Sequence, residues 1–248
     1  MNLDIDFAYT PDLRNLPSAS EHFAILWKVA LLLDTVGMPL EDWCPPADTP
    51  EDARRNQAFD RDGPTPAALA IVEEEERSDP ANGCRYLGIW NGYEEEGGSS
   101  ILLGLKQTDG SGNCTFRLQA QAVPALSRKA NLVKVLTGLS LQWQPPFIVV
   151  DPGNYGTRQK VFADRPGAGW LLYLPGRITR AHVPEAAELL PVLNEDGQQR
   201  GTIIVSVTGD AFDDENPDHI QAANAIEIRL ADQDLLPRYR ALSSARTP

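Results

Sequence analysis

The stretch from Cys84 to Gln121, CRYLGIWNGYEEEGGSSILLGLKQTDGSGNCTFRLQAQ, decides the fold class of this chain. It contains three segments, CRYLGIWNG, SILLGLKQ and CTFRLQAQ, whose length and apolar pattern are typical of β-strands. The turn signals Gly97-Gly98 and Asp109-Gly110-Ser111-Gly112 separate the segments. Short turns of this kind join strands that run in opposite directions. The stretch therefore predicts an antiparallel meander, with GYEEEGG at the tip of its first hairpin.

Upstream of the meander the sequence carries one strand signal and several helix starts. The N-terminal residues LDIDF alternate between apolar and acidic side chains, which predicts a half-buried strand. Ser18 and Glu21 form a capping box ahead of an apolar helix face. Thr49 and Thr65 are each followed by a proline, which is the pattern of a capping residue with proline in the first turn. We expect helices to begin at all three places.

Downstream of the meander, helix and strand signals are interleaved. Ser127 is predicted to cap a helix, and Asn216-Pro217 to open the last one, although AIEIRLAD inside that segment also alternates like a strand. Short buried strands are predicted at 147–150 and 170–174, and GTIIVSVTG is the clearest strand signal in the chain.

Strands grouped in the middle, with helices at both ends, indicate an α+β fold with a central, mainly antiparallel sheet flanked by helices. We expect a single domain over residues 1–240, with a possible subdomain boundary near 80–83, where the sequence reads PANG. The polar segment 241–248 is expected to be a flexible tail.

Net charge limits the kinds of partner. The 248 residues include 35 Asp and Glu against 22 Lys and Arg, a net charge of -13. A nucleic-acid binder needs basic surface to displace counterions, so direct binding of nucleic acid is not expected. The longest apolar run is too short to span a bilayer, and the first residues do not have the pattern of a signal peptide. Because the apolar runs are short, we expect no membrane partner. Three cysteines without C-x-x-C spacing are best explained as reduced thiols in a cytoplasmic protein.

The sequence carries no motif of a known catalytic or cofactor site. None of the three histidines has a His or Cys neighbour at metal-ligand spacing, and no nucleophile elbow or phosphate-binding loop occurs. Asp151 followed by Lys160 is the one arrangement that suggests a metal-dependent hydrolase. Gln159 directly adjoins Lys160, so the expected spacing is missing, and a second acid is absent. We therefore expect no catalytic residues, no metal and no cofactor.

Acidic residues gather at 73–76, at 94–96 and in DAFDDENPDH near the C-terminus. Each group alone is consistent with solvated surface, and acids before the last helix also suit its N-terminus. The middle group differs because two aromatic residues adjoin it, a composition typical of surfaces that bind a basic protein. We predict a partner-binding surface composed of Trp90, Tyr93, Glu94, Glu95, Glu96, Asp213, Asp214, Glu215 and Asp218.

Three stretches resemble the immunity protein 52 family. They are AFDRDGPTPAALAIVEEE (Ala58 to Glu75), YLGIWNGYEEEGGSSI (Tyr86 to Ile101) and the segment from Pro191 to Pro237. The resemblance covers most of residues 1–240. It implies an immunity protein that binds and neutralises a cognate toxin, namely a restriction-endonuclease-like nuclease that is a type VI secretion effector. It supplies no motif of binding residues, so the predicted surface depends on composition alone.

Two other functions stay open at this point. An effector-loading adaptor would bind the toxin without silencing it, and a metal-dependent hydrolase is the less favoured alternative.

The basic residues between Arg128 and Arg180 fit a purely acidic binding surface poorly. They are expected either to pair with the protein's own acids or to bind acids on the toxin.

Overall fold

The computed structural model describes residues 1–9, 16–108 and 111–239. The chain divides into two compact units, which are described separately. The first, Thr10–Ala125, is called the meander unit, and the second, Met1–Tyr9 with Leu126–Pro248, is called the terminal unit. The segment 80–83 lies inside the meander unit, and the expected tail at 241–248 lies outside the described residues. A single domain over 1–240 stays a prediction.

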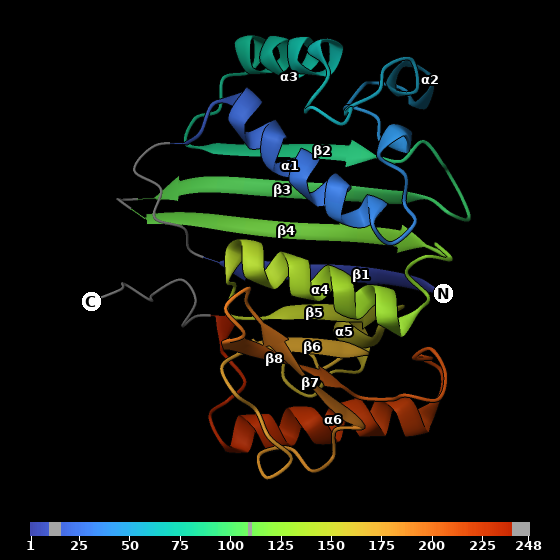
Figure 1. Ribbon diagram of the computed structural model, residues 1–248, viewed down its shortest axis with the longest axis vertical. Helices are drawn as coiled ribbons and strands as arrows, with labels where there is room; N and C mark the ends of the chain where they lie inside the picture. The colour runs from blue at the N-terminus through green and yellow to red at the C-terminus, as the bar shows by residue number, and fades with distance from the viewer. Residues whose placement is uncertain (10–15, 109–110, 240–248) are drawn as a thin grey trace. The chain divides into compact units, whose positions relative to one another are not determined.

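The three strands of the meander unit form as predicted. They are β2 (Cys84–Trp90), β3 (Ser99–Thr108) and β4 (Ser111–Gln121), and they pair antiparallel in sequence order. Four helical segments accompany them: α1 (Ala19–Asp34), η1 (Leu40–Asp42), α2 (Pro50–Ala53) and α3 (Pro66–Ser78). Helix α1 lies across one face of the three strands (Figure 1).

Cap chemistry explains where these helices begin. The Ser18 side chain accepts from the Glu21 N–H at 3.2 Å, and the Glu21 carboxylate accepts from the Ser18 N–H at 2.8 Å. This completed capping box starts α1 where the sequence predicted. Thr49 and Thr65 accept from backbone N–H groups in the first turns of α2 and α3, again as predicted.

The two faces of the meander have different environments. Leu87, Leu103 and Phe116 are in register across the strands and are buried on the face that α1 covers. On the opposite face Tyr86 is 59% exposed and Leu102 is 46% exposed. Successive side chains of each strand point to opposite faces, so the meander has one core face and one solvent-exposed face.

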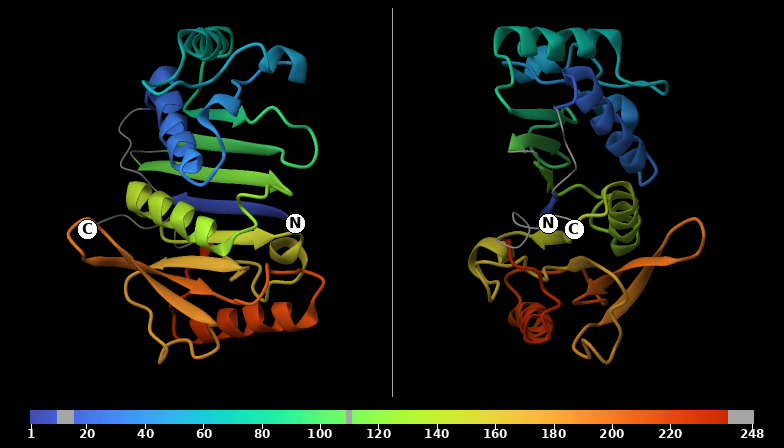
Figure 2. Two further views of the ribbon diagram at one scale, coloured as in Figure 1. Left: turned by 45° about the vertical axis from the view of Figure 1, so that its right-hand side comes forward. Right: turned by 90° about the vertical axis from the view of Figure 1, so that its left-hand side faces the viewer.

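The terminal unit contains five strands in the order β1-β5-β6-β8-β7, all antiparallel. Their bounds are β1 Asn2–Tyr9, β5 Ile148–Pro152, β6 Leu171–Pro175, β7 Glu188–Leu193 and β8 Gln199–Val205. Helix α4 (Lys129–Trp143) lies on one face, whereas α5 (Tyr155–Arg158) and α6 (Pro217–Asp232) lie on the other (Figure 2). Consecutive residues of β6 are buried because both faces of the sheet are covered.

The predicted α+β class with antiparallel strands and flanking helices is confirmed. Two local predictions need correction. Ser127 is not the N-cap of α4, because the helix begins at Lys129 after Arg128 and has no side-chain cap bond. Strand β7 was not among the predicted strands, and it contains Pro191. Proline is tolerated there because β7 pairs only with β8 and is an edge strand. The ambiguous segment after Asn216 is helical.

None of the helices in the described ranges is both long and apolar enough to cross a bilayer.

Candidate interaction surface

Residues 91–98, called the acidic loop, connect β2 to β3 and are held by hydrogen bonds at their base. The Asn91 side chain is 8% exposed. It donates from Nδ2 to the Gly97 carbonyl at 2.8 Å and accepts from the Ser99 N–H at 2.7 Å. The Gly97 N–H donates to the carbonyl of Gln121, at the end of β4, at 2.7 Å. The exposed tip therefore projects from a backbone that is fixed on both sides.

Glycine is needed at position 98 because the loop folds closely back on itself. A Cβ at Gly98 would lie 2.6 Å from the Tyr93 carbonyl oxygen and 2.8 Å from the Glu95 carbonyl oxygen. The Gly98 N–H uses this close approach to donate to the Glu95 carbonyl at 2.8 Å. Only a residue without a side chain permits that contact, so the glycine keeps three glutamates together in a tight turn.

Arg54, at the end of α2, ties the acidic loop to the segment before it. Its guanidinium lies 5.0 Å from the centre of the Trp90 ring, donates from Nε to the Gly92 carbonyl at 2.9 Å, and reaches Glu94 Oε1 at 2.7 Å. The Trp90 indole in turn donates to the Tyr93 carbonyl at 3.0 Å. Trp90 and Glu94 therefore have roles within the fold as well as being predicted contact residues.

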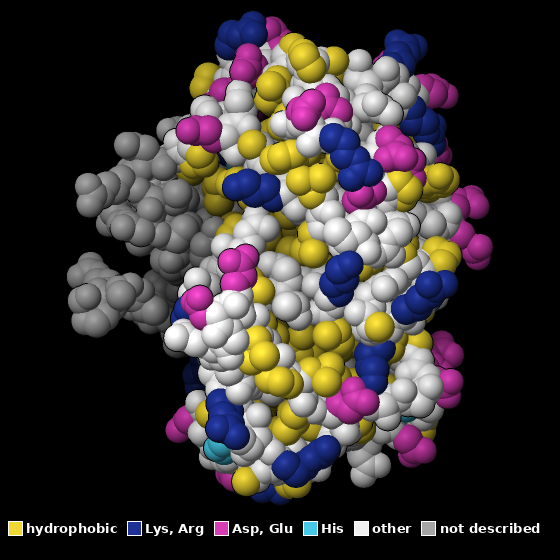
Figure 3. All heavy atoms as spheres, viewed as in Figure 1, with side chains coloured by type: hydrophobic (Ala, Val, Ile, Leu, Met, Phe, Trp, Pro, Cys, Tyr) yellow, Lys and Arg dark blue, Asp and Glu magenta, His cyan; other side chains and the backbone are white. Residues whose placement is uncertain are grey.

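The rest of the loop tip is available to a partner. Tyr93 is 53% exposed, and Glu95 and Glu96 are exposed and take part in no ion pair among the residues that the structure describes. On the face drawn in Figure 3, Asp and Glu side chains gather at the edge where Figure 1 draws this loop. The structure thus holds two carboxylates and one phenol ring together in water.

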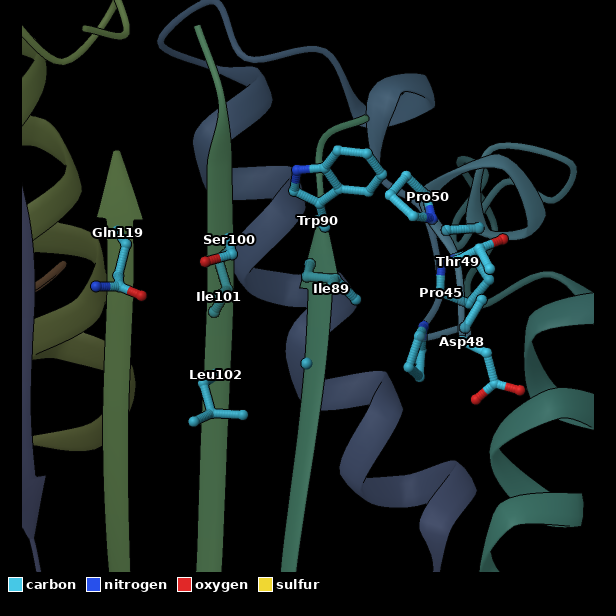
Figure 4. A pocket seen from close by; sticks show the side chains of 14 residues that line it. Pro45, Asp48, Thr49, Pro50, Ile89, Trp90, Ser100, Ile101, Leu102 and Gln119 are labelled. Carbon is cyan, nitrogen blue, oxygen red and sulfur yellow. The ribbon is translucent and has the colours of Figure 1, made fainter. Parts of the chain in front are cut away.

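A hollow of about 430 Å³, called the proline hollow, lies beside Trp90 within the meander unit (Figure 4). One wall is the segment 45–50, and the floor is the open face of three neighbouring strands. The Trp90 indole extends toward Pro50 at one end of the hollow. Strand residues that line the floor include Gly88, Ser100, Leu102 and Gln119. Its lining is mainly apolar, which is the usual character of a binding pocket.

A second hollow of about 250 Å³ lies within the same unit and has Tyr93, Asn91 and Gly97 in its lining. Trp43 also lines it, and its indole N–H is buried without a hydrogen-bond partner among the described residues. The two aromatic residues beside the glutamates therefore line different hollows, with Trp90 at the first and Tyr93 at the second.

Acidic residues also surround the proline hollow. Asp48 lines it directly, and the adjoining helix α2 carries Glu51 and Asp52 in its first turn. Burial, together with the nearby carboxylate of Asp48, raises the pKa of Glu75 on α3 above its usual value. Burial is the larger cause of this shift and the Asp48 carboxylate adds to it, so Glu75 and Asp48 lie close enough to repel each other.

The second predicted cluster belongs to the terminal unit, and its acids have mostly local roles. Asp214 is half-buried and accepts from the Asn154 N–H at 2.8 Å, and the carboxylate of Asp213 accepts from the Glu215 N–H at 2.9 Å. Asp218 is exposed in the first turn of α6, where a negative charge favours the helix dipole. The acids at 94–96 and those at 213–218 thus belong to different units.

Two buried acids of the terminal unit also have structural roles. Glu227 of α6 is fully buried and accepts from the Tyr155 hydroxyl at 2.5 Å, the Val161 N–H at 2.8 Å and the Ala168 N–H at 2.9 Å. Asp151 accepts from the Gly156 N–H at 2.8 Å. Both carboxylates therefore hold the segment between β5 and β6 in place.

Asp151 and Lys160, on which the hydrolase alternative depends, both have hydrogen-bond partners within the terminal unit. Burial, reinforced by Asp6 and Asp4, raises the pKa of Asp151 to about 7, against the opposing effects of the Gly156 N–H and Lys160. The Lys160 ammonium donates to the Arg165 carbonyl at 3.1 Å and to the Tyr239 hydroxyl at 3.3 Å. Within residues 1–9, 16–108 and 111–239, no group of three or more His, Cys, Asp or Glu is arranged to hold a metal ion.

Several basic residues between Arg128 and Arg180 are used inside the terminal unit. Lys129 pairs with Glu188 at 2.7 Å. Arg165 is buried and donates to the Leu236 carbonyl, and Arg180 donates to the Ala186 carbonyl. These contacts account for part of the basic segment as internal pairing.

The sequence did not predict the residues that line the proline hollow beside the acidic loop, or the arginine that holds this loop. Leu102 could have been identified from the sequence, because it is a large apolar residue at a strand position whose side chain faces solvent. Arg54 and the wall at 45–50 carried no such signal, since Arg54 meets Glu94, and the wall meets the strands of the hollow, across about forty or more positions of sequence.

Comparison with known proteins gives one family match. The family model described as immunity protein 52 matches residues 26–238, which include the acidic loop and the acids at 213–218. Among solved structures, a T6SS protein of Pseudomonas aeruginosa matches with a TM-score of 0.45 and 9% sequence identity, over 90% of this chain and 72% of that chain. No curated protein matches the chain.

Proposed function

Because the chain belongs to the immunity protein 52 family, we propose that it neutralises a cognate toxin by binding it, with the acidic loop facing the toxin. The observation that carries this proposal is that the tip of the acidic loop displays carboxylates to solvent. Glu95 and Glu96 are exposed beside exposed Tyr93, outside any ion pair of the described residues, on a loop whose base is fixed. Glu95 and Glu96 are adjacent and repel each other, so displaying both costs the isolated protein stability that a basic partner would recover.

A nuclease toxin fits this surface in chemical terms. A nuclease presents Lys and Arg to the phosphates of DNA, so an acidic inhibitor is attracted to the same surface and excludes the substrate. The net charge of -13 increases the rate of encounter with such a surface. The fixed base of the acidic loop reduces the conformational entropy lost on binding. Inhibition of this kind requires no catalytic residue in the immunity protein.

We assign the acids at 213–218 a separate and secondary contact with the toxin, on the terminal unit. Asp213, Glu215 and Asp218 are exposed, so their side chains remain available to the toxin. The half-buried Asp214 carboxylate is bound to the Asn154 N–H and instead positions the segment. The principal contact is therefore proposed at the acidic loop.

Mixing the purified protein with its cognate toxin is expected to stop the degradation of DNA by that toxin. The measurement is the amount of intact plasmid DNA at increasing ratios of immunity protein to toxin. An effector-loading adaptor would bind the toxin and leave degradation unchanged. Full degradation at a large excess of the immunity protein would refute neutralisation, whether or not a complex forms.

The variant Glu95→Lys with Glu96→Lys is expected to slow association with an inactivated form of this toxin about tenfold at low salt. It should also weaken the dependence of the association rate on salt, because two attractive charges become repulsive. Glu94 is left unchanged so that its ion pair with Arg54 continues to hold the loop. Stopped-flow association at several salt concentrations measures both effects.

The matched control is Glu195→Lys with Asp196→Lys, in the exposed turn between β7 and β8. Each double variant replaces two negative charges by two positive ones, so the net charge of -13 becomes -9 in both. The control should associate nearly as fast as the parent. Equal slowing by the two variants would mean that total charge, and not the acidic loop, governs the encounter.

A further inference from the structure

The proline hollow combines features that the acidic loop lacks. It is enclosed by Pro45 and Pro50 on one side and by the open face of the meander on the other, with the Trp90 indole at one end (Figure 4). Its volume of about 430 Å³ exceeds that of a single large side chain and lies within the range of small-ligand pockets. Leu102, 46% exposed, contributes an apolar side chain to its floor.

The charges around the proline hollow have one predominant sign. Asp48 and Glu51 take part in no ion pair among the described residues, whereas the nearby cations Arg54 and Arg55 are already paired, with Glu94 and Asp52 respectively. The Asp48 carboxylate also contributes to the raised pKa of Glu75, although burial is the larger cause. An apolar ligand with negative charge would be repelled here, and one with flanking positive charge would be attracted.

We propose that the proline hollow receives one apolar side chain carried on a basic segment of the toxin, while neighbouring Lys or Arg residues of that segment face Asp48, Glu51 and the acidic loop. This inference rests on the proposed function and deepens it by naming the anchor and the chemistry that recognises it. Trp90 belongs to both parts of the surface, because it lines the hollow and directly precedes the acidic loop in the chain.

The two parts of the surface have different consequences for the kinetics of binding. Exposed carboxylates act at long range and mainly determine how fast the partners meet. A desolvated apolar anchor acts only after contact and mainly determines how slowly they separate. A defect in the hollow is therefore distinguishable from a defect in the acidic loop by the rate constant that changes.

The variant Ser100→Trp tests the proposal by filling the hollow. Ser100 lies in the floor of the hollow on β3, and its half-exposed side chain has no hydrogen bond among the described residues. An indole at this position occupies the space meant for the toxin side chain. Dissociation of the inactivated toxin should become about 100-fold faster, with association and its salt dependence nearly unchanged. Surface plasmon resonance gives both rate constants.

Asn113→Trp is the matched control. Asn113 is exposed on β4, on the same face of the meander, and lies outside the lining of the hollow. It introduces the same aromatic side chain without filling the hollow, so its dissociation rate should equal that of the parent. Circular dichroism compares the folding of the two variants.

A second variant keeps the test decisive if Ser100→Trp fails to fold. Leu102→Lys places a positive charge in the floor of the hollow, at a side chain exposed enough to tolerate a polar group. It removes apolar surface and repels a basic segment, so dissociation should again accelerate at least tenfold. Parent-like dissociation of a folded Ser100→Trp or Leu102→Lys variant would overturn the proposed anchor and leave the proposed function intact. If the parent protein does not bind the toxin, the proposed function itself is wrong.

Discussion

Replacing Glu227 with alanine is expected to lower the free energy of unfolding by about 3–5 kcal/mol. Glu227 is fully buried, and its carboxylate accepts from the Tyr155 hydroxyl and from the N–H groups of Val161 and Ala168. Removal of the carboxylate leaves the N–H groups of Val161 and Ala168 without this acceptor, whereas the Tyr155 hydroxyl can still donate to Asn224 Oδ1 at 2.8 Å. Each buried donor that loses its acceptor costs about 1–3 kcal/mol before relaxation. The cavity left by the side chain adds to this loss. Urea unfolding followed by far-UV circular dichroism measures the change.

Ile228→Ala is the control for Glu227→Ala, because Ile228 is the next residue of the same helix and is 53% exposed. Its effect should be smaller than 1 kcal/mol, since little packing is lost. Glu227→Gln should give an intermediate loss, because its amide keeps one acceptor oxygen but turns an N–H donor toward a backbone donor. A loss below 1 kcal/mol for Glu227→Ala would show that the segment between β5 and β6 does not depend on this carboxylate.

Replacing Asp151 with asparagine is expected to stabilise the protein at pH 8 by up to about 3–4 kcal/mol. Burial and the carboxylates of Asp6 and Asp4 raise the pKa of Asp151 from 3.8 to about 7. Below pH 3.8 the acid is neutral in both the folded and the unfolded states. Between pH 3.8 and 7 the folded protein binds more protons, so stability falls as pH rises. Asparagine keeps the oxygen that accepts from the Gly156 N–H and cannot ionise.

The informative quantity is the difference in unfolding free energy between Asp151→Asn and the parent, measured at pH 8 and at pH 4.5. It should be large at pH 8 and fall to about 1 kcal/mol at pH 4.5, where the unfolded acid is still mostly ionised and the folded acid is neutral. His22 titrates in the opposite sense: burial and Arg85 lower its pKa to about 4, so its contribution to stability falls as pH drops from 6.5 to 4. This contribution is the same in both proteins and cancels. A variant less stable than the parent at pH 8 would contradict the prediction.

Predictions from the sequence succeeded wherever the deciding interactions are local. The alternation along Cys84–Trp90 and the glycine pair at 97–98 predicted the first hairpin, and the Ser18 capping box predicted the start of α1. These signals act between residues a few positions apart, so they are readable without knowing the fold. Local signals did not identify β7, whose Pro191 is tolerated because this strand lies at the edge of the sheet.

The candidate surface was predictable only in part. Composition identified the acids and aromatics of the acidic loop, and the structure shows Tyr93, Glu95 and Glu96 exposed there. Composition did not separate these residues from Asp214, whose carboxylate is bound to the Asn154 N–H sixty positions away. It also did not indicate the proline hollow, because the wall and the floor of the hollow come from segments that meet only after folding.

The sequence by itself determined the α+β class, the meander, the excess of negative charge and the place of three glutamates at a hairpin tip. Periodicity and cap chemistry are properties of neighbouring residues, and net charge is a property of the whole composition, so none of them depends on the tertiary structure. Only the tertiary structure decided which acids serve the fold and which face water. Glu94 is held by Arg54, forty positions away, whereas Glu95 and Glu96 have no ion pair among the described residues. The physical reason is that a carboxylate's role depends on the donors around it, and those donors are brought together by long-range packing.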